Sequence, residues 1–361
     1  MIGVGIIGAT GMVGQRYITL LQGHPWFQVT CVAASAQSAG MSYVQSVKGR
    51  WQMTEPIPKK VGELMVVDAS DTEVIAHSCD FVFSAVEMPD KEKVKQLEES
   101  FAAAGLPVIS SASAHRWTPD VPMLLPEINS DHTKMIDIQR KNRGWSTGFI
   151  VVKPNCSIQS FLTPIYALRQ AGYEVDRLSV VTMQAISGAG YPGVPSLDMI
   201  DNIVPLIGGE EEKTEKEPLK ILSNIKKESF VLADNITITA ACNRVPVSDG
   251  HTACVSMSFK KKKPTKEQVI SIWKSFSSMP QELELPMAPK QAIIYLEEDN
   301  RPQPKKDRDN EQGMAVSVGR LRECPLLDFK FVGLSHNTIR GAAGGGILNA
   351  ELLVKQGYIT K

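Results

Sequence analysis

IGVGIIGATGMVG, residues 2–14, decides the fold of the first part of the chain. Its first half, IGVGIIG, is a short run rich in Ile and Val, which is typical of a buried parallel strand. GATGMVG then places glycines at 8, 11 and 14, and apolar residues recur at helical spacing from Val13 to Leu21. A strand, a glycine-rich turn and an amphipathic helix in this order predict a dinucleotide-binding site, with the pyrophosphate at the helix N-terminus.

Further strands alternate with helices up to residue 111. Candidate strands cover residues 27–34, 64–69, 80–86 and 107–111, and a charged helix covers 89–104. This alternation predicts a Rossmann-type, doubly wound parallel sheet. Because chain termini often lie close together, we expect the apolar helix within residues 337–357 to return to this first domain.

The pattern changes after Cys156. A helix is expected at 157–172, with a kink at Pro164, and the longer segments 176–187, 236–247, 250–259 and 313–323 have the character of antiparallel strands. These segments predict an α+β domain with a mixed, largely antiparallel sheet. The expected domains are therefore 1–155 plus 337–361, which binds the dinucleotide, and 156–336.

Length and composition narrow the function further. The 361 residues suit two domains. The 39 basic and 39 acidic residues cancel, so neither nucleic acid nor an anionic membrane is indicated as a partner. No stretch resembles a signal peptide or a membrane span, which predicts a cytoplasmic protein. The six cysteines form no CxxC pair and no zinc-like spacing with histidine, so we expect neither a disulfide framework nor a metal site.

The choice of dinucleotide depends on the end of the second strand. NAD sites usually place an acidic residue there, on the ribose 2′-hydroxyl. AASAQSAG, residues 33–40, has no acid but offers Ser35, Gln37 and Ser38. Small polar donors accept a 2′-phosphate that a carboxylate would repel, so this segment favours NADP over NAD. The alternative is that these three residues are only a loop.

VVKPNCSIQS, residues 151–160, contains the candidate nucleophile. Cys156 lies on a polar turn before a predicted helix, where exposed N–H groups would lower the pKa of a thiol. A thiolate is a strong nucleophile toward carbonyl carbon. The catalytic partner is to be found among six histidines, of which His251 opens a strand after a turn and His115 is its rival.

Seven motifs, in the same order along the chain, resemble those of aspartate-β-semialdehyde dehydrogenases of the archaeal and fungal type. They are GATGMVGQRY (8–17), SSASAHRW (110–117), KPNCS (153–157), QAISGAGYPG (184–193), GGEEEKTEKE (208–217), RVPVSDGH (244–251) and NTIRGAAGG (337–345). The resemblance implies NADPH-dependent conversion of L-4-aspartyl phosphate to L-aspartate 4-semialdehyde, reversible with phosphate, through a cysteine thioacyl enzyme. It also implies a role in lysine, threonine, methionine and isoleucine biosynthesis.

The resemblance assigns roles to eight residues. Cys156 matches the nucleophile and His251 the general acid–base. Asn155 and Gln184 match residues that hold and orient the substrate. Arg244 matches the residue that binds the α-carboxylate, Glu210 the one that binds the ammonium group, and the phosphate-binding pair matches Lys213 and Arg116. Without the family register, Glu211 and Glu212 compete with Glu210, Arg116 could pair with Asp120, and Gln184 could be an ordinary strand residue.

The resemblance also extends the cofactor site to Asn337 at its nicotinamide end and to a second glycine-rich wall at residues 187–190. The candidate cofactor-binding residues are Gly8, Thr10, Gly11, Met12, Val13, Gly14, Ser35, Gln37, Ser38, Ser84, Ser187, Gly188 and Asn337. The resemblance implies that residues 156–336 form the catalytic, substrate-binding and dimerisation domain, and we expect a homodimer or a tetramer.

The same sequence features are compatible with three rival functions. N-acetyl-γ-glutamyl-phosphate reductases and malonyl-CoA reductases would use the same scaffold and the same thiol. A non-enzymatic NADP-binding regulator would need the cofactor cleft but not Cys156.

Overall fold

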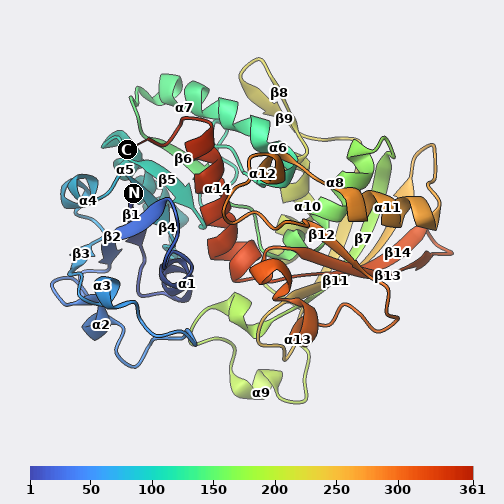
Figure 1. The fold of residues 1–361 in the computed structure, drawn as a ribbon, viewed down its shortest axis with the longest axis horizontal. Coiled ribbons are helices and arrows are strands. Elements are labelled where there is room, and N and C mark those ends of the chain that lie inside the picture. The colour runs from blue at the N-terminus through green and yellow to red at the C-terminus, as the bar shows by residue number, and fades with distance from the viewer. Residues whose placement is uncertain (361) are drawn as a thin grey trace.

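The computed structural model describes residues 1–360, which form two lobes, each built on a six-stranded sheet (Figure 1). In the first lobe all strands are parallel, as predicted, in the order β3-β2-β1-β4-β5-β6. The strand order reverses between β1 and β4, which is where α/β sheets bind their ligands. The strands are β1 (Ile2–Ile7), β2 (Phe27–Ala34), β3 (Val66–Asp68), β4 (Phe81–Ser84), β5 (Pro107–Ser110) and β6 (Phe149–Val152).

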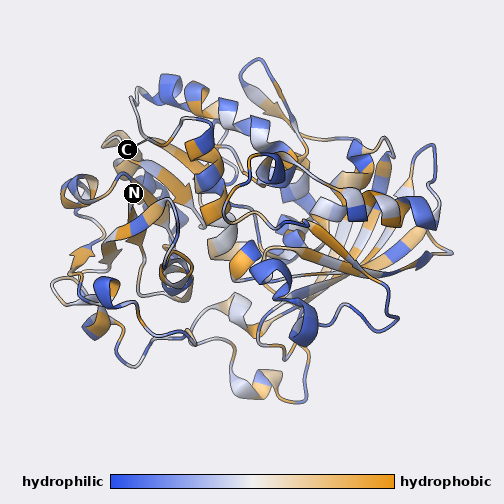
Figure 2. Ribbon diagram, viewed as in Figure 1, coloured by the Kyte–Doolittle hydropathy of each residue, from blue (hydrophilic) through white to orange (hydrophobic). Residues whose placement is uncertain are grey.

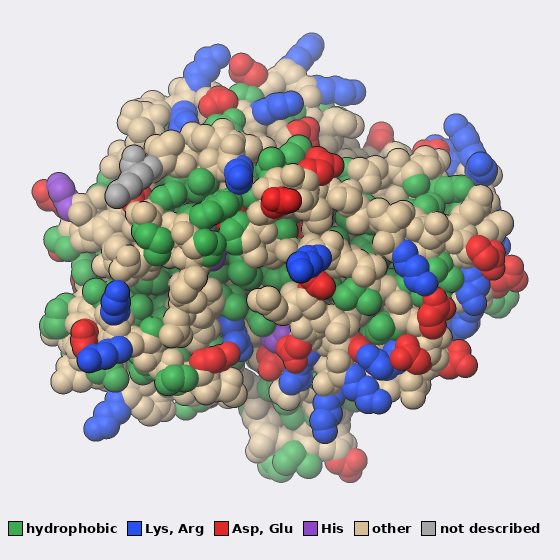
Figure 3. All heavy atoms as spheres, viewed as in Figure 1, with side chains coloured by type: hydrophobic (Ala, Val, Ile, Leu, Met, Phe, Trp, Pro, Cys, Tyr) green, Lys and Arg blue, Asp and Glu red, His purple; other side chains and the backbone are tan. Residues whose placement is uncertain are grey.

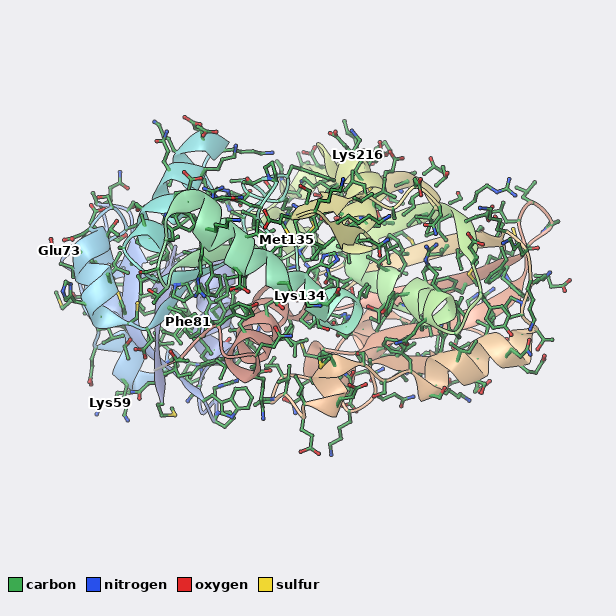
Figure 4. The ribbon with its side chains drawn as sticks, turned by 90° about the horizontal axis from the view of Figure 1, so that it is seen from above. Lys59, Glu73, Phe81, Lys134, Met135 and Lys216 are labelled. Atoms are coloured by element: carbon green, nitrogen blue, oxygen red, sulfur yellow. The ribbon has the colours of Figure 1, made fainter. Side chains whose placement is uncertain are left out.

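Helices cover both faces of this sheet. Figure 2 shows hydrophobic residues concentrated on the strands, whereas α7 alternates between hydrophobic and hydrophilic positions. On the core side of α1 the ring of Tyr17 stacks on Phe83, and Phe81, labelled in Figure 4, packs against Phe83 inside the lobe. The helices are α1 (Met12–Leu20), α2 (Tyr43–Ser46), α3 (Lys59–Gly62), α4 (Thr72–Ser78), α5 (Lys91–Ala103), α6 (Pro126–Asn129) and α7 (Met135–Arg143), with a 3-10 turn η1 (Ser130–Lys134).

The last helix, α14 (Gly344–Lys355), returns to the first lobe. Its residues Ile347, Ala350 and Leu353 belong to the same buried cluster as Val4 of β1. The two chain ends lie near one another on this lobe (Figure 1). A π-helical turn, η5 (Ile339–Ala343), leads into α14 and packs against α1.

The sheet of the second lobe is mixed, in the order β10-β7-β11-β14-β13-β12. β11 pairs antiparallel with β7 and β14, and β13 with β14, but β7–β10 and β12–β13 are parallel. The long connection between β7 and β10 permits that parallel pairing. The strands are β7 (Val175–Gln184), β10 (Thr237–Arg244), β11 (His251–Phe259), β12 (Ile293–Leu296), β13 (Val316–Glu323) and β14 (Phe329–Ser335).

The helices α8 (Leu162–Gln170) and α11 (Lys266–Ser275) cover one face of the mixed sheet, and the other face is exposed. Trp273 of α11 is fully buried there, and its indole N–H donates to Pro164 O at 2.9 Å. Ser179, Val181 and Cys254 point away from that core and are exposed. The remaining elements are α10 (Glu210–Ile221), a hairpin of β8 (Asn224–Lys226) and β9 (Ser229–Val231), α12 (Met279–Glu282), α13 (Pro304–Asp307) and η4 (Asn310–Gly313).

The helix expected at residues 157–172 is divided. A 3-10 turn, η2 (Ser157–Ser160), follows Cys156, and α8 begins only after Phe161, whose φ of −138° is not helical. Pro164 lies in the first turn of α8, where its missing N–H costs nothing, so it causes no kink. Cys156 therefore precedes a single short turn and not a long helix.

An extended segment, residues 191–207, projects from the second lobe and carries α9 (Ser196–Met199), which Figures 1 and 3 show at the lower edge of the molecule. It presents Leu197, Ile200, Ile203 and Leu206 to solvent, with Leu197 85% exposed. Within residues 1–360, no helix has the length and apolar character to cross a membrane.

Candidate active site

Three strand ends of the mixed sheet meet at one point. β7 and β10 run parallel, and their registers pair Gln184 with Arg244 at their last residues. β11 runs antiparallel to β7, so its first residue, His251, lies at the same end. The turn after β6 brings Cys156 to this point from the first lobe. Strand polarity therefore explains why side chains far apart in sequence converge.

Cys156 and His251 face each other. The sulfur lies 3.4 Å from Nε2 of the ring, and His251 is completely buried. Nδ1 accepts a hydrogen bond from the backbone N–H of Ala185 at 3.0 Å, so the single proton of the neutral ring is on Nε2, facing the sulfur. The rival, His115, is directed toward Thr118 Oγ1 and Lys95 O, whereas His251 contacts the sulfur of Cys156.

The expected low pKa of the Cys156 thiol is wrong for the free protein. Burial raises the pKa of Cys156 to about 11, and the nearby Glu210 carboxylate adds to the rise. The positive charges of Lys153, Arg116 and Arg244 lower that pKa in part. A single 3-10 turn supplies too little helix dipole to offset desolvation.

Glu210 begins α10 and points into the site. Its Oε1 accepts from Asn155 Nδ2 at 3.0 Å and from Lys213 Nζ at 2.8 Å. Glu211 instead accepts from the backbone of β10, and the exposed Glu212 pairs with Lys216. The helix start thus selects the first of the three glutamates as the one that faces the cavity.

Arg116 lines the same cavity as Glu210 and does not pair with Asp120, which Arg143 binds through two bonds. Its Nη1 donates to Glu217 Oε1 at 2.8 Å, and its Nε and Nη2 reach the carbonyls of Lys153 and Ser111 at 3.2 and 3.4 Å. A guanidinium has five N–H groups, so two remain for a ligand.

Sequence reasoning missed Glu217, although it lies seven residues after Glu210 on the same face of α10. Both of its oxygens are committed: Oε1 to Arg116, and Oε2 to the backbone N–H of Asn155 at 2.7 Å. Thr214, between them, bonds Ser157 through their hydroxyls at 2.8 Å. One face of α10 therefore anchors both the loop that carries Arg116 and the turn that carries Cys156. The helical spacing from Glu210 was the sequence signal that could have identified Glu217.

Two adjoining cavities share Cys156 on their walls. The larger, about 390 Å³, is polar and charged, and is lined by Cys156, Asn155, Gln184, Arg244, Glu210, Lys213 and Arg116. The smaller, about 190 Å³, is lined by the start of α1 and by Ser187, Gly188, Asn337 and Cys156. A hollow of about 490 Å³ lies elsewhere, between α8 and the β8–β9 hairpin, away from these residues. The shared sulfur can therefore meet one ligand from each side.

The glycine-rich turn fits a dinucleotide. Gly8 has φ of +80°, and a side chain there would meet Ala85 O at 2.7 Å. A side chain on Gly14 would overlap the backbone of the turn, whereas one on Gly11 would make only an ordinary contact, with Gly8 O at 3.5 Å. Gly11 caps α1 without a side-chain bond, so the N–H groups of the first turn, at Met12 and Val13, are available for an anion.

The other predicted cofactor residues divide into three groups. Ser187 and Asn337 bond one another at 2.8 Å on the wall of the smaller cavity, beside Gly188. Ser35 and Gln37 are exposed beyond β2, next to the glycine turn, whereas Ser38 is 6% exposed. Thr10 and Ser84 line neither cavity, and Ser84 is buried beside Glu98.

Comparison with family models gives two matches that together span most of the chain. Residues 3–136 match the semialdehyde dehydrogenase NAD binding domain, and residues 165–340 match the semialdehyde dehydrogenase dimerisation domain. Aspartate-semialdehyde dehydrogenase of Schizosaccharomyces pombe is 47% identical over 360 residues, covering 99% of both chains. That of Archaeoglobus fulgidus is 43% identical over 356 residues, again covering 99% of both.

Comparison with solved structures gives the same family. Aspartate semialdehyde dehydrogenase from Candida albicans, determined with NADP, superposes with a TM-score of 0.91 at 40% identity, over 99% of this chain and 100% of that one. The Vibrio cholerae enzyme II, at 22% identity and a TM-score of 0.76, shares the fold.

Proposed function

This chain belongs to the aspartate-semialdehyde dehydrogenases, and from that premise we propose how its residues act. The enzyme converts L-4-aspartyl phosphate and NADPH to L-aspartate 4-semialdehyde, phosphate and NADP, and runs in reverse with phosphate. The observation that carries the assignment of residues is the 3.4 Å contact between Cys156 Sγ and His251 Nε2, because Cys156 also lies on the wall of a cavity lined by groups of both charges.

The charges of the larger cavity match those of the substrate. The substrate offers an α-carboxylate, an α-ammonium and a dianionic phosphate. Arg244 suits the carboxylate, because its fork can donate two parallel bonds, and Glu210 suits the ammonium. The two uncommitted N–H groups of Arg116, together with Lys213, suit the phosphate. Asn155 and Gln184 lie beside Glu210 and orient the acyl group between these contacts.

The smaller cavity suits the nicotinamide end of NADP. The N–H groups at Met12 and Val13 would hold the pyrophosphate, Ser35 and Gln37 the 2′-phosphate, and Ser187, Gly188 and Asn337 the nicotinamide end. When bound, the reduced nicotinamide supplies the hydride that the thioester carbon receives. Because Cys156 lines both cavities, the acyl group that it carries would face that side.

The chain's own residues carry out the acyl chemistry. The sulfur of Cys156 attacks the acyl carbon, and phosphate leaves to give a thioester. In the opposite direction the same sulfur adds to the aldehyde. In both directions negative charge develops on the former carbonyl oxygen, and the Nε2–H of His251, beside the sulfur, is a donor for it.

A phosphate-dependence assay tests this function. With aspartate semialdehyde, phosphate and NADP, absorbance of reduced nicotinamide should rise steadily, and omission of phosphate should stop turnover. Cys156→Ser should lose turnover but still bind NADP. Turnover that needs coenzyme A in place of phosphate would instead indicate a malonyl-CoA reductase.

Two rival functions fit the cavity less well. An N-acetylated substrate has no ammonium group for Glu210 to bind, which disfavours an N-acetyl-γ-glutamyl-phosphate reductase. A non-enzymatic NADP sensor would leave the pairing of Cys156 with His251 without a use.

Surface features and free thiols bear on assembly and location. The match to a dimerisation domain, the uncovered sheet face with Val181 and Cys254, and the apolar segment 191–207 support a homodimer or a tetramer. Equilibrium sedimentation distinguishes the two.

The six cysteines are all free thiols, which supports a cytoplasmic location. The packing of α14 on the first sheet supports the division into 1–155 plus 337–361 and 156–336.

A further inference from the structure

We propose that Lys220 is a positioning residue for phosphate, because its ammonium group holds the main chain of the loop at residues 116–121 and so places Arg116 in the larger cavity. The inference rests on the proposed function, in which Arg116 binds phosphate. It adds a residue to which the family register assigns no role.

The loop that carries Arg116 has little structure of its own to hold it. Residues 111–121 follow β5 and form only turns and bends. Backbone bonds inside the loop close single turns, as from Thr118 N to His115 O at 3.0 Å and from Val121 N to Thr118 O at 3.2 Å. The position of Arg116 therefore depends on contacts with other parts of the fold.

Lys220 supplies three such contacts. Its ammonium group donates to the carbonyl oxygens of Arg116 at 2.7 Å, Val121 at 2.9 Å and Thr118 at 3.3 Å. An ammonium group has three N–H donors, so all three are committed to one loop and none remains for a ligand. The side chain is 3% exposed, so its removal would leave buried carbonyl groups without a partner, which is costly.

Lys220 continues the face of α10 that lines the site. Four charged residues follow one another along α10 at steps of three, four and three: Glu210, Lys213, Glu217 and Lys220. These steps are the spacing of one helical face. Glu217 binds the guanidinium group of Arg116, and Lys220, one turn later, binds its carbonyl oxygen. One helix therefore holds both the side chain and the main chain of the phosphate-binding arginine.

The aromatic ring of Phe230, on β9, covers the ammonium group. Nζ of Lys220 lies 4.8 Å from the centre of this ring, whose face attracts a positive charge. Because the side chain is buried beneath the ring, water does not compete for its three bonds to the loop.

The charge of Lys220 depends on pH. Burial lowers the pKa of Lys220 to about 8, and Asp120 and Glu217 raise it. Two further titratable groups lie nearby: Arg116, which is bound to Glu217, and His132 of η1, whose pKa is lowered by burial and then by Lys220. Lys220 is therefore an ammonium at neutral pH, and above a pH of about 8 it becomes a neutral amine with one donor fewer.

Steady-state kinetics, with phosphate and aspartate semialdehyde varied in turn, tests the proposal. In Lys220→Met the KM for phosphate should rise by about ten-fold or more, which corresponds to the loss of one charged hydrogen bond. The kcat at saturating phosphate and the KM for aspartate semialdehyde should stay within about two-fold of wild type. A side chain that only stabilises the fold would instead reduce the amount of active enzyme, which lowers kcat and leaves both KM values unchanged.

Two more variants sharpen the test. Lys216→Met is the matched control, because it removes an exposed lysine of the same helix, which pairs with Glu212, and it should match the wild type. Lys220→Arg keeps the positive charge and cannot lose its proton, so its KM for phosphate at neutral pH should stay within about three-fold of wild type. In the wild type this KM should rise above a pH of about 8, and in Lys220→Arg the rise should be smaller. Lys153, which also titrates in the site, is the same in both enzymes.

Three results would overturn the proposal: an unchanged KM for phosphate in Lys220→Met, a loss confined to kcat in that variant, or a rise with pH of equal size in the wild type and Lys220→Arg. If neither Lys220 variant folds, the wild-type profile decides, because a KM for phosphate that stays constant above a pH of about 8 excludes this role. Wild-type turnover that does not need phosphate is a separate result, which would refute the proposed function itself.

Discussion

Replacement of Glu217 by Gln should impair catalysis and folding without weakening the phosphate site. Glu217 is completely buried, and each of its two oxygens accepts a charge-assisted or backbone bond, from Arg116 at 2.8 Å and from Asn155 N at 2.7 Å. Gln has the same shape but only one acceptor oxygen, and its NH₂ group would face the second donor.

The size of the effect follows from these contacts. Removing the charge of one partner from a buried ion pair costs about 3–5 kcal/mol of unfolding free energy. The backbone N–H of Asn155 holds the turn that carries Cys156, and a shift of about 1 Å at a reacting atom costs roughly 10²-fold in rate. We therefore expect kcat to fall by about that factor. The KM for phosphate should not rise, because loss of the carboxylate frees one more N–H of Arg116.

Steady-state kinetics with phosphate as the varied substrate, together with urea unfolding, measures both effects. Glu212→Gln is the matched control, because this glutamate lies on the solvent side of the same helix and pairs with Lys216, which Figure 4 shows at the rim of the molecule. The control should match the wild type in both assays. A kcat of Glu217→Gln within about two-fold of wild type, or a raised KM for phosphate with unchanged kcat, would refute the reasoning.

Three further changes have defined outcomes. Glu98 is buried and its pKa is raised to about 7 by desolvation, so it is neutral when folded below that pH and ionises on unfolding above its ordinary value of 4.5. The stability that neutral Glu98 contributes at low pH is lost as pH rises from 4.5 to about 7. In urea unfolding, Glu98→Gln should therefore raise the free energy of unfolding by about 3 kcal/mol at pH 8 and leave it unchanged at pH 4. An equal gain at both pH values would contradict this. Gly188→Ala should lower kcat/KM by about ten-fold or more, because the new methyl group would crowd Arg244 and His251, and normal kinetics would show that this wall can yield. Arg244→Lys should raise the KM for aspartate semialdehyde by about ten-fold, since a point charge does not replace a two-pronged contact, and an unchanged KM would remove Arg244 from carboxylate binding.

Local periodicity made the first lobe predictable. Short apolar strands alternate with helices there, and the glycine turn follows directly after β1, so residues close in sequence form the site. In the second lobe the parallel pairing of β7 with β10 depends on a connection of about fifty residues, which no local pattern describes. The interruption of the helix at Phe161 could not be predicted from the sequence either, because the residues on both sides of it favour a helix.

Residue type and a polar turn were enough to single out Cys156, whereas His251 and Arg244 received their roles by resemblance. The burial of these side chains could not be predicted from the sequence. Desolvation raises the pKa of Cys156 and lowers that of Lys153, and it depends on η5 and α14, which belong to the end of the chain. Glu210 was singled out by resemblance, and the structure adds the reason, namely that α10 begins at that residue.

The mass of the peptide that contains Cys156 tests the central claim most directly. The enzyme would be mixed with aspartate semialdehyde and NADP without phosphate, quenched in acid and digested. A thioacyl enzyme predicts an aspartyl group on Cys156 and none in the absence of NADP. An unmodified Cys156 peptide from enzyme that has reduced its bound NADP under these conditions would contradict covalent catalysis at this sulfur.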